Sequence, residues 1–159
     1  MTTQEVEMLN QIKADKPKTA VGNDTFLTDL DVRIWLRDND PYANNLIQDF
    51  EFTPEEIRTA MTLTVDYWND RPPYIRNYDY TEFPFRSQLL TGTAANLLFI
   101  AANRYRRNSL QYSAGGTMVA DQEKYQQYDA AGARLWEEYK AWVVENKRAI
   151  NATIGWASI

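Results

Sequence analysis

The stretch from Phe85 to Asn108 carries an apolar pattern that a helix can satisfy only when it is enclosed by other elements. One helical face recurs at spacings of three and four residues: Leu90, Ala94, Leu97, Ala101 and Tyr105. Leu89, Ile100 and Phe99 widen this face until the middle of the stretch is apolar nearly all round. The apolar run is short and interrupted by asparagines and arginines, so it does not fit a membrane span. The sequence therefore predicts a central buried helix over about residues 85–108.

Three further helices are predicted around it, each with a recognisable start. Thr28 and Asp31 form a capping signature before a short helix, which ends at Pro41. Thr53-Pro54-Glu55-Glu56 opens a second helix with proline at its first position. A third, after Asp121, carries a strict three-four aromatic spacing. The fold class expected is mainly α, a helical bundle with one core: Leu90, Leu97, Leu98, Ala101, Met61, Val65, Trp68, Leu135, Tyr139 and Trp142.

The composition excludes several classes of function. The 159 residues are enough for one domain with a sizeable core. Cysteine and histidine are both absent, which removes thiolate chemistry, disulfides and the commonest general base and metal ligand. No catalytic constellation is found, so the chain is expected to be non-enzymatic, with no cofactor and no metal. The segment DNDPYANN resembles a calcium loop, but it lacks the EF-hand glycine and glutamate, and a turn with backbone-capping side chains is favoured.

Two segments allow a nucleic-acid interpretation. The loop over residues 71–84 is rich in tyrosine, phenylalanine and proline, which is compatible with base stacking. Arg104, Arg106 and Arg107 close the central helix, where they could contact phosphates. The plainer interpretations are favoured: the rings pin the loop over the central helix, and the cations complement the helix dipole. The net charge of −5 also disfavours broad binding to a phosphate backbone.

A small β-hairpin is expected over about residues 109–120, because apolar residues alternate around a Gly-Gly pair. A lone hairpin is marginally stable and would lean on its own domain or on another chain. The hairpin residues expected at an inter-subunit contact are Tyr112, Gly115, Gly116 and Met118.

Both ends of the chain are expected to be extended. Residues 1–25 are polar and weakly patterned, as in an N-terminal arm, and they lack a secretory signal. Residues 26–149 form the helical domain. Residues 150–159 have no charged side chain but carry several large apolar ones, so this end is expected to be a docking tail. Folding back on the chain's own bundle is the alternative. The docking residues expected are Ile150, Ile154, Trp156 and Ile159.

The order of segments resembles that of phage virion proteins of the head–tail connector type, also called adaptor or neck proteins. The resemblance covers about residues 26–159. It depends on the succession of a short helix, a capped amphipathic helix, an aromatic loop, a small-residue helix and a tryptophan-bearing last helix. Its most specific phrases are Thr53-Pro54-Glu55-Glu56-Ile57, Val65-Asp66-Tyr67-Trp68-Asn69 and Tyr112-Ser113-Ala114-Gly115-Gly116.

The resemblance implies a structural protein of a tailed bacteriophage virion that joins the portal to the tail. Copies would form a homo-oligomeric ring of about twelve subunits beneath the portal protein, contacting a tail-side neck or terminator protein. DNA would pass through without specific binding, and no membrane is involved. The location implied is the head–tail interface of the virion, and the host cytoplasm during assembly. The alternative function is a nucleic-acid-binding helical module that uses the arginines at 104–107 and the aromatic loop over 74–85.

Overall fold

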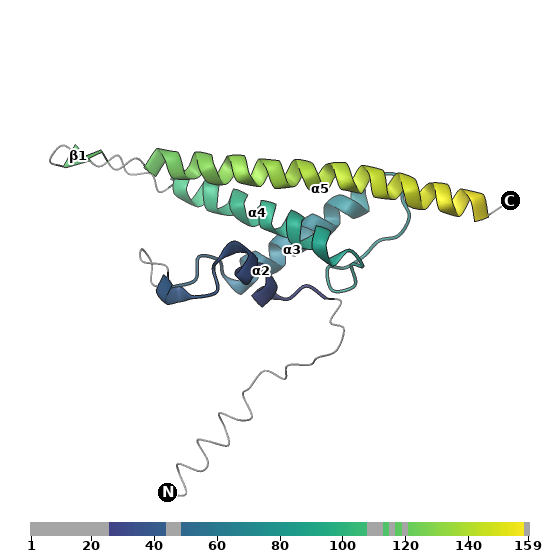
Figure 1. The fold of residues 1–159 in the computed structure, drawn as a ribbon, viewed down its shortest axis with the longest axis horizontal. Helices are drawn as coiled ribbons and strands as arrows, with labels where there is room; N and C mark the ends of the chain where they lie inside the picture. Colours follow the sequence, from purple (N-terminus) through teal and green to yellow (C-terminus); the bar gives the residue numbers. More distant parts are fainter. Residues whose placement is uncertain (1–25, 44–48, 108–112, 115–116, 119–120, 158–159) are drawn as a thin grey trace, which may run out of the picture.

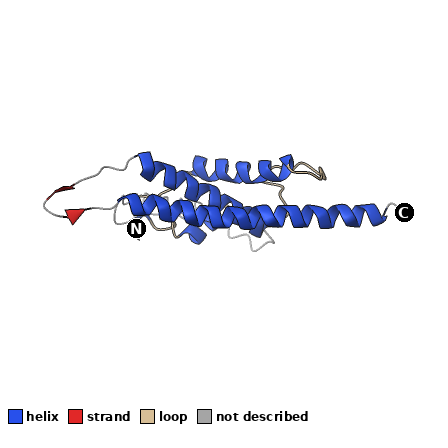
Figure 2. Cartoon of the chain, turned by 90° about the horizontal axis from the view of Figure 1, so that it is seen from above, coloured by secondary structure: helices blue, strands red, loops and turns tan. Residues whose placement is uncertain are grey.

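The chain is mainly α-helical, as expected, in a computed structural model that describes residues 26–43, 49–107, 113–114, 117–118 and 121–157. Figure 1 shows one long helix with the shorter helices gathered along one side of it, and Figure 2 shows the same arrangement from above. The helical elements, in chain order, are α2 (Asp29–Leu36), the short 3-10 helix η1 (Pro41–Ala43), α3 (Pro54–Asp70), α4 (Arg86–Arg107) and α5 (Asp121–Ala157).

Helix α4 is the central element, which confirms the expectation drawn from its apolar pattern. It contacts α2, α3 and α5, and its closest companion along its length is α5. The two helices run antiparallel, because Phe85 near the start of α4 packs on Trp142, and Tyr105 near its end stacks on Tyr128. Helix α3 contacts both of them: it packs on α4, and its Thr64 carbonyl accepts a hydrogen bond from the Tyr139 hydroxyl of α5 at 2.7 Å.

A small residue allows α3 and α4 to approach closely at their crossing. A Cβ atom added at Gly92 of α4 would lie 2.3 Å from Cγ2 of Thr64 on α3, well inside contact distance. Thr64 is fully buried and bonds its hydroxyl to the Ala60 carbonyl at 2.8 Å, so it has little freedom to move away. Glycine at position 92 therefore sets the spacing between these two helices.

The predicted core residues lie largely where the sequence places them. Trp68, Met61, Val65, Leu97, Ala101 and Tyr139 are buried in one cluster. Leu90 and Trp142 are half-buried and pack against that cluster. The prediction of a single core is wrong in one detail. Leu135 and Leu98 belong to a smaller neighbouring cluster with Ala94 and Ala95, because α4 and α5 are lined with small side chains at that level.

The expected hairpin has limited support in the described residues. Strands β1 (Ser113–Ala114) and β2 (Thr117–Met118) pair antiparallel, with Ser113 opposite Met118. A pairing of two residues in each strand is too short to count as an independently stable hairpin. Residues 108–112, 115–116 and 119–120 lie outside the described residues, so the hairpin over 109–120 stays a prediction.

The C-terminal segment is not extended, which corrects the sequence-based expectation. Residues 150–157 continue α5, and Thr153 bonds its hydroxyl to the Ala149 carbonyl at 2.9 Å within that helix. No proline interrupts the segment and alanine recurs in it, so it propagates a helix that is already nucleated. The N-terminal arm over residues 1–25 lies outside the described residues. In the described part of the chain, no helix is long and apolar enough to cross a membrane.

Candidate assembly and binding surfaces

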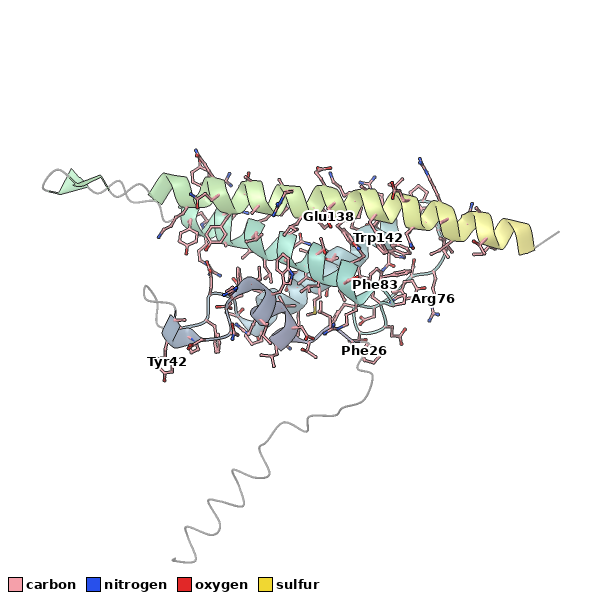
Figure 3. All side chains as sticks on the ribbon, in the orientation of Figure 1. Phe26, Tyr42, Arg76, Phe83, Glu138 and Trp142 are labelled. Carbon is pink, nitrogen blue, oxygen red and sulfur yellow. The ribbon has the colours of Figure 1, made fainter. Side chains whose placement is uncertain are left out.

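Helix α2 presents apolar side chains on its outer side as well as towards the core. Val32 is fully buried, whereas Leu30 and Ile34, four residues apart, are 59% and 54% exposed. Phe26, just before the helix, and Trp35 are also exposed, and Figure 3 shows Phe26 at the lower edge of the molecule, away from α5. We name Phe26, Leu30, Ile34 and Trp35 the α2 apolar face. Four large apolar side chains are thus exposed within ten residues, and exposed apolar side chains that gather on one surface mark interaction sites.

The position of α2 is fixed by polar contacts at both of its ends. At its start, Thr28 and Asp31 form the predicted capping box, with the Thr28 amide 2.8 Å from the Asp31 carboxylate. Asp31 also pairs with Arg86 of α4 at 2.8 Å. At its end, Arg33 pairs with the buried Asp38 at 2.7 Å. The α2 apolar face is therefore presented by a helix that is anchored to the rest of the bundle.

The four expected docking residues at the C-terminus have different environments. Ile150 is half-buried and packs against the main core. Ile154 is 52% exposed, one turn further along α5. Trp156 lies within the helix, and Ile159 lies outside the described residues. Figures 1 and 2 show the last turns of α5 projecting past the other helices. Ile150 therefore serves the chain's own core, and the expected docking segment beyond it is helical up to Ala157.

The expected inter-subunit residues are mostly beyond what the structure describes. Tyr112, Gly115 and Gly116 lie outside the described residues, and Met118 is part of β2. Their role at a subunit contact stays a prediction.

The rings of the aromatic loop are mostly used inside the protein. Phe83 is buried, and its ring packs edge-on to Trp68 and Tyr78, with centroids 5.6 and 5.7 Å apart. Phe85 packs on Trp142 at 4.9 Å, and Figure 3 shows Phe83 and Trp142 on the same inner side of the molecule. The loop is thus pinned by its rings, which meet Trp68 of α3 and Trp142 of α5 within the core cluster that also contains Leu89 of α4. Tyr74, at 77% exposure, is the ring of this loop most open to a ligand in the described residues.

Arg104, one of the three arginines at the end of α4, is engaged within the fold. Its guanidinium donates to the Glu51 carbonyl and to the Glu56 carboxylate, both at 2.6 Å. Arg106 donates to the Asn103 side chain at 3.0 Å. A phosphate contact by Arg104 would have to replace two short intramolecular bonds, so the cluster offers less charge to a nucleic acid than its sequence implies.

A polar junction joins the 49–53 link to α2, α4 and α5. Asp38 accepts hydrogen bonds from the backbone amides of Glu51, at 2.6 Å, and Phe52, at 3.2 Å. The Glu51 carboxylate accepts hydrogen bonds from the hydroxyls of Tyr105, at 3.2 Å, and Tyr128, at 3.5 Å. Among the described residues no group of three or more His, Cys, Asp or Glu side chains is placed to hold a metal ion. Asp38 and Asp40 instead cap backbone amides, as the turn interpretation of DNDPYANN expects.

The carboxylates of this junction have perturbed ionisation. Partial burial raises the pKa of Glu51, and the hydrogen bonds from Tyr105 and Tyr128 and the charge of Arg104 only partly oppose this rise. For Glu56 the balance is reversed: burial opposes, but hydrogen bonds from the Thr53 backbone and from Arg104 hold its pKa below the usual value. Burial and the charge of Glu51 raise the pKa of both Tyr105 and Tyr128.

A cavity of about 710 Å³ adjoins this junction, between the α2–η1 segment and the facing ends of α4 and α5. Its lining is mixed in character, with Leu36, Leu98 and Ala131 as apolar members. Its charged and aromatic members include Arg37, Asp40, Glu51, Tyr105, Lys124 and Tyr128. The rings of Tyr105 and Tyr128 stack in parallel, 5.3 Å apart at an angle of 11°.

A buried lysine closes the opposite end of α3. Lys147 of α5 is 1% exposed, and its ammonium group donates to the carbonyls of Trp68 and Arg71, where α3 ends. The same ammonium lies 4.9 Å from the ring centroid of Trp68. Burial lowers the pKa of Lys147, and Asp70 opposes that shift. A cation at this position complements the carbonyl end of α3, where the Trp68 carbonyl also accepts a hydrogen bond from the Arg71 amide at 3.3 Å.

Sequence reasoning placed Lys147 in a positively charged helix end and gave no role to Glu51. The spacing Tyr139–Val143–Lys147 does put the lysine on the buried face of α5, so helical periodicity could have located it. Glu51 lies in an irregular link, where no periodicity predicts which way a side chain points. Comparisons with protein-family models, with curated proteins and with solved structures gave no match for this chain.

Proposed function

We propose that this chain is a structural subunit of a tailed-phage virion, a ring-forming head–tail connector that joins the portal to the tail. The observation that carries the proposal is the α2 apolar face, which a fixed helix holds outward while its opposite side packs in the core. Exposed apolar side chains that gather on one surface are typical of sites that bind another chain. The segment order that resembles connector proteins supplies the identity of the assembly.

The projecting end of α5 is separate from the α2 apolar face, and we assign it to docking on the portal-side or tail-side ring. The α2 apolar face and the projecting end of α5 lie on different parts of the molecule, as Figure 1 shows. With the docking tail reserved for a neighbouring ring, the α2 apolar face can serve contacts within the ring, and a heterologous contact closes into a ring when the rotation permits. The net charge of −5 suits a channel through which DNA slides, because acidic side chains disfavour a static complex with phosphates.

The first test removes the α2 apolar face. Leu30→Ser with Ile34→Ser should weaken self-association at least tenfold, which is about 1.4 kcal/mol per contact, without lowering the melting temperature appreciably. Sedimentation velocity over a range of concentrations, together with electron microscopy of the particles, measures the effect. Leu63→Ser is the matched control, because Leu63 is an exposed leucine of α3 at 48% exposure. A wild-type chain that stays monomeric at every concentration contradicts the ring.

The second test concerns the docking tail. Removing residues 154–159 should leave thermal stability nearly unchanged but prevent attachment to the portal-side or tail-side ring, measured by co-sedimentation with the portal protein. Removing residues 150–159 should also lower the melting temperature, because Ile150 packs on the core. Each kcal/mol lost shifts the midpoint by about 2–4 °C in a domain of this size. A chain shortened at residue 154 that still joins the portal would show that this segment is not the docking tail.

A further inference from the structure

We propose that the α2 apolar face of one subunit is covered by the N-terminal segment of a second copy of this chain, through Val6, Leu9 and Ile12. These three side chains recur at a spacing of three residues in the arm that precedes the helical domain. The inference rests on the proposed function in requiring that copies of this chain associate. It deepens that function by naming the segment that the face binds.

The charges beside the α2 apolar face favour an apolar partner. Asp31 is paired with Arg86 at 2.8 Å, and Arg33 is paired with Asp38 at 2.7 Å. Because these four side chains already neutralise one another within the subunit, they offer little attraction to a charged ligand. The exposed apolar side chains of the face, in contrast, gain free energy when water is removed from them. The face therefore suits a short segment that mixes apolar and polar side chains, as residues 1–13 do.

Among the described residues, no other helix or loop carries exposed large apolar side chains close together in sequence. The remaining ones occur singly in η1, the 49–53 link, α3 and the loop over 71–84, and ten residues apart on α5: Tyr42, Phe50, Leu63, Tyr74, Val144 and Ile154. Of these, Ile154 belongs to the projecting end of α5, which the proposed function assigns to another ring. A heterologous contact needs two complementary surfaces on each subunit. The apolar segment of the arm supplies the second surface.

The arm is long enough to reach a neighbouring subunit. Phe26, the first residue of the α2 apolar face, accepts a hydrogen bond on its carbonyl from Arg86 of α4 at 3.3 Å, and Figure 3 shows it at the lower edge of the molecule. Residues 13–25 separate it from the apolar segment, and these thirteen residues span at most about 45 Å. The eight residues of α2 are only about 12 Å long. Each subunit can therefore place its segment on the face of the next copy.

The test changes both sides of the contact in the full chain and measures self-association by sedimentation velocity. Leu9→Ser with Ile12→Ser should weaken self-association at least tenfold. Adding Leu30→Ser and Ile34→Ser to that chain should weaken it no further, because both pairs of substitutions remove the same contact. Equal association of the wild type and of the chain with Leu9→Ser and Ile12→Ser would show that another segment covers the face, and would overturn the proposal.

A matched control changes apolar residues of the arm outside this segment. Ala20→Ser with Val21→Ser should associate like the wild type. The same tenfold loss in this control would show that the arm acts without its apolar segment, which also overturns the proposal. The melting temperature of each variant, measured at a concentration where the wild type is dissociated, should be unchanged, so that lost association is not mistaken for lost folding.

Mixing two variants then separates a neighbour's arm from the subunit's own. The chain with Leu9→Ser and Ile12→Ser keeps its α2 apolar face, and the chain with Leu30→Ser and Ile34→Ser keeps its arm. At a concentration where each alone is monomeric, the mixture should form one-to-one pairs, which have a single contact and cannot close into a ring. A mixture that stays monomeric would show that the arm does not bind a second copy, and would overturn the proposal.

The same measurements separate the failure of this inference from the failure of the proposed function. Rings that form equally well without the apolar segment leave the proposed function in place and overturn the inference. Association that depends on both the segment and the face, but yields pairs or open chains and no rings, supports the inference and contradicts the ring. A wild type that stays monomeric at every concentration contradicts both.

Discussion

The two ends of the α4–α5 pair are closed by opposite kinds of chemistry. One end is sealed by rings that surround Trp68, with centroid separations between 5.4 and 6.5 Å: Tyr78, Phe83, Phe85 and Trp142. The other end is sealed by the polar junction of Glu51, Arg104, Tyr105 and Tyr128, beside a cavity. The aromatic end gains its stability from burial, whereas the polar end depends on which groups are ionised. The first is suited to holding the fold and the second to recognition.

The aromatic end should give the largest loss of stability when it is disrupted. Trp68→Ala removes a side chain that is 1% exposed and contacts four other rings, so unfolding should become easier by about 3–5 kcal/mol. Urea-induced unfolding followed by circular dichroism measures this. Tyr74→Ala in the neighbouring loop is the control and should change stability by less than about 0.5 kcal/mol, because Tyr74 is exposed. Similar losses for the two variants would remove the contrast between the ends.

The polar end should give a smaller loss. Arg104→Met keeps the length of the side chain but removes both bonds of the guanidinium, to Glu51 and Glu56. Because both side chains of the ion pair are about one-third exposed, the loss should be about 1–2 kcal/mol, below that of a buried pair. Arg58→Met, which breaks a more exposed contact with Glu55, should cost less than about 0.5 kcal/mol in the same experiment. An Arg104 variant as stable as that control would show that the junction contributes no stability.

The smallest expected effect is the contribution of Glu51, at the polar end, to the pH dependence of stability. Burial raises the pKa of Glu51 above its ordinary value of 4.5, so the folded state binds a proton more tightly than the unfolded state. Stability therefore falls as pH rises from about 4.5 through the folded pKa, and Glu51→Gln should lack this component. Glu56 and Asp31 have lowered pKa values and act in the opposite direction, losing their stabilisation as the pH falls below their ordinary values. The measurement compares the thermal midpoints of the wild type and of Glu51→Gln between pH 4 and pH 8. The difference between the two midpoints should change by on the order of a degree across this range.

The same contrast explains how much could be predicted from the sequence. Helix starts at Thr28 and Thr53, and the buried stripe through Leu97 and Ala101, follow local rules of capping and periodicity, and the structure confirms them. The sequence predicts that the rings pin the aromatic loop, but it does not specify that Trp68 and Trp142 are the rings they meet. The apolar content of the C-terminus suggests an extended docking tail. The segment has no proline and follows a helix that is already formed, so it continues α5.

The polar junction was missed for a related reason. Glu51 and Asp38 are 13 residues apart, and their contact depends on how the 49–53 link passes between helices. Arg104 lies 53 residues from Glu51, in a cluster whose charges were attributed to the helix dipole. Long-range polar contacts of this kind have no sequence spacing to reveal them. The α2 apolar face was likewise visible only once the side facing the core was known.

The burial of Lys147 gives the chain a chemical reporter of its own motion. An amine-reactive acylating reagent attacks only the neutral, accessible form of a lysine, and this side chain is enclosed between Trp68 and the end of α3. Acylation at this position must therefore wait until the last turns of α5 separate from α3, whereas the exposed face of Lys140 needs no such event. The ratio of the two labelling rates thus measures how often this end of the bundle opens, without any change to the sequence.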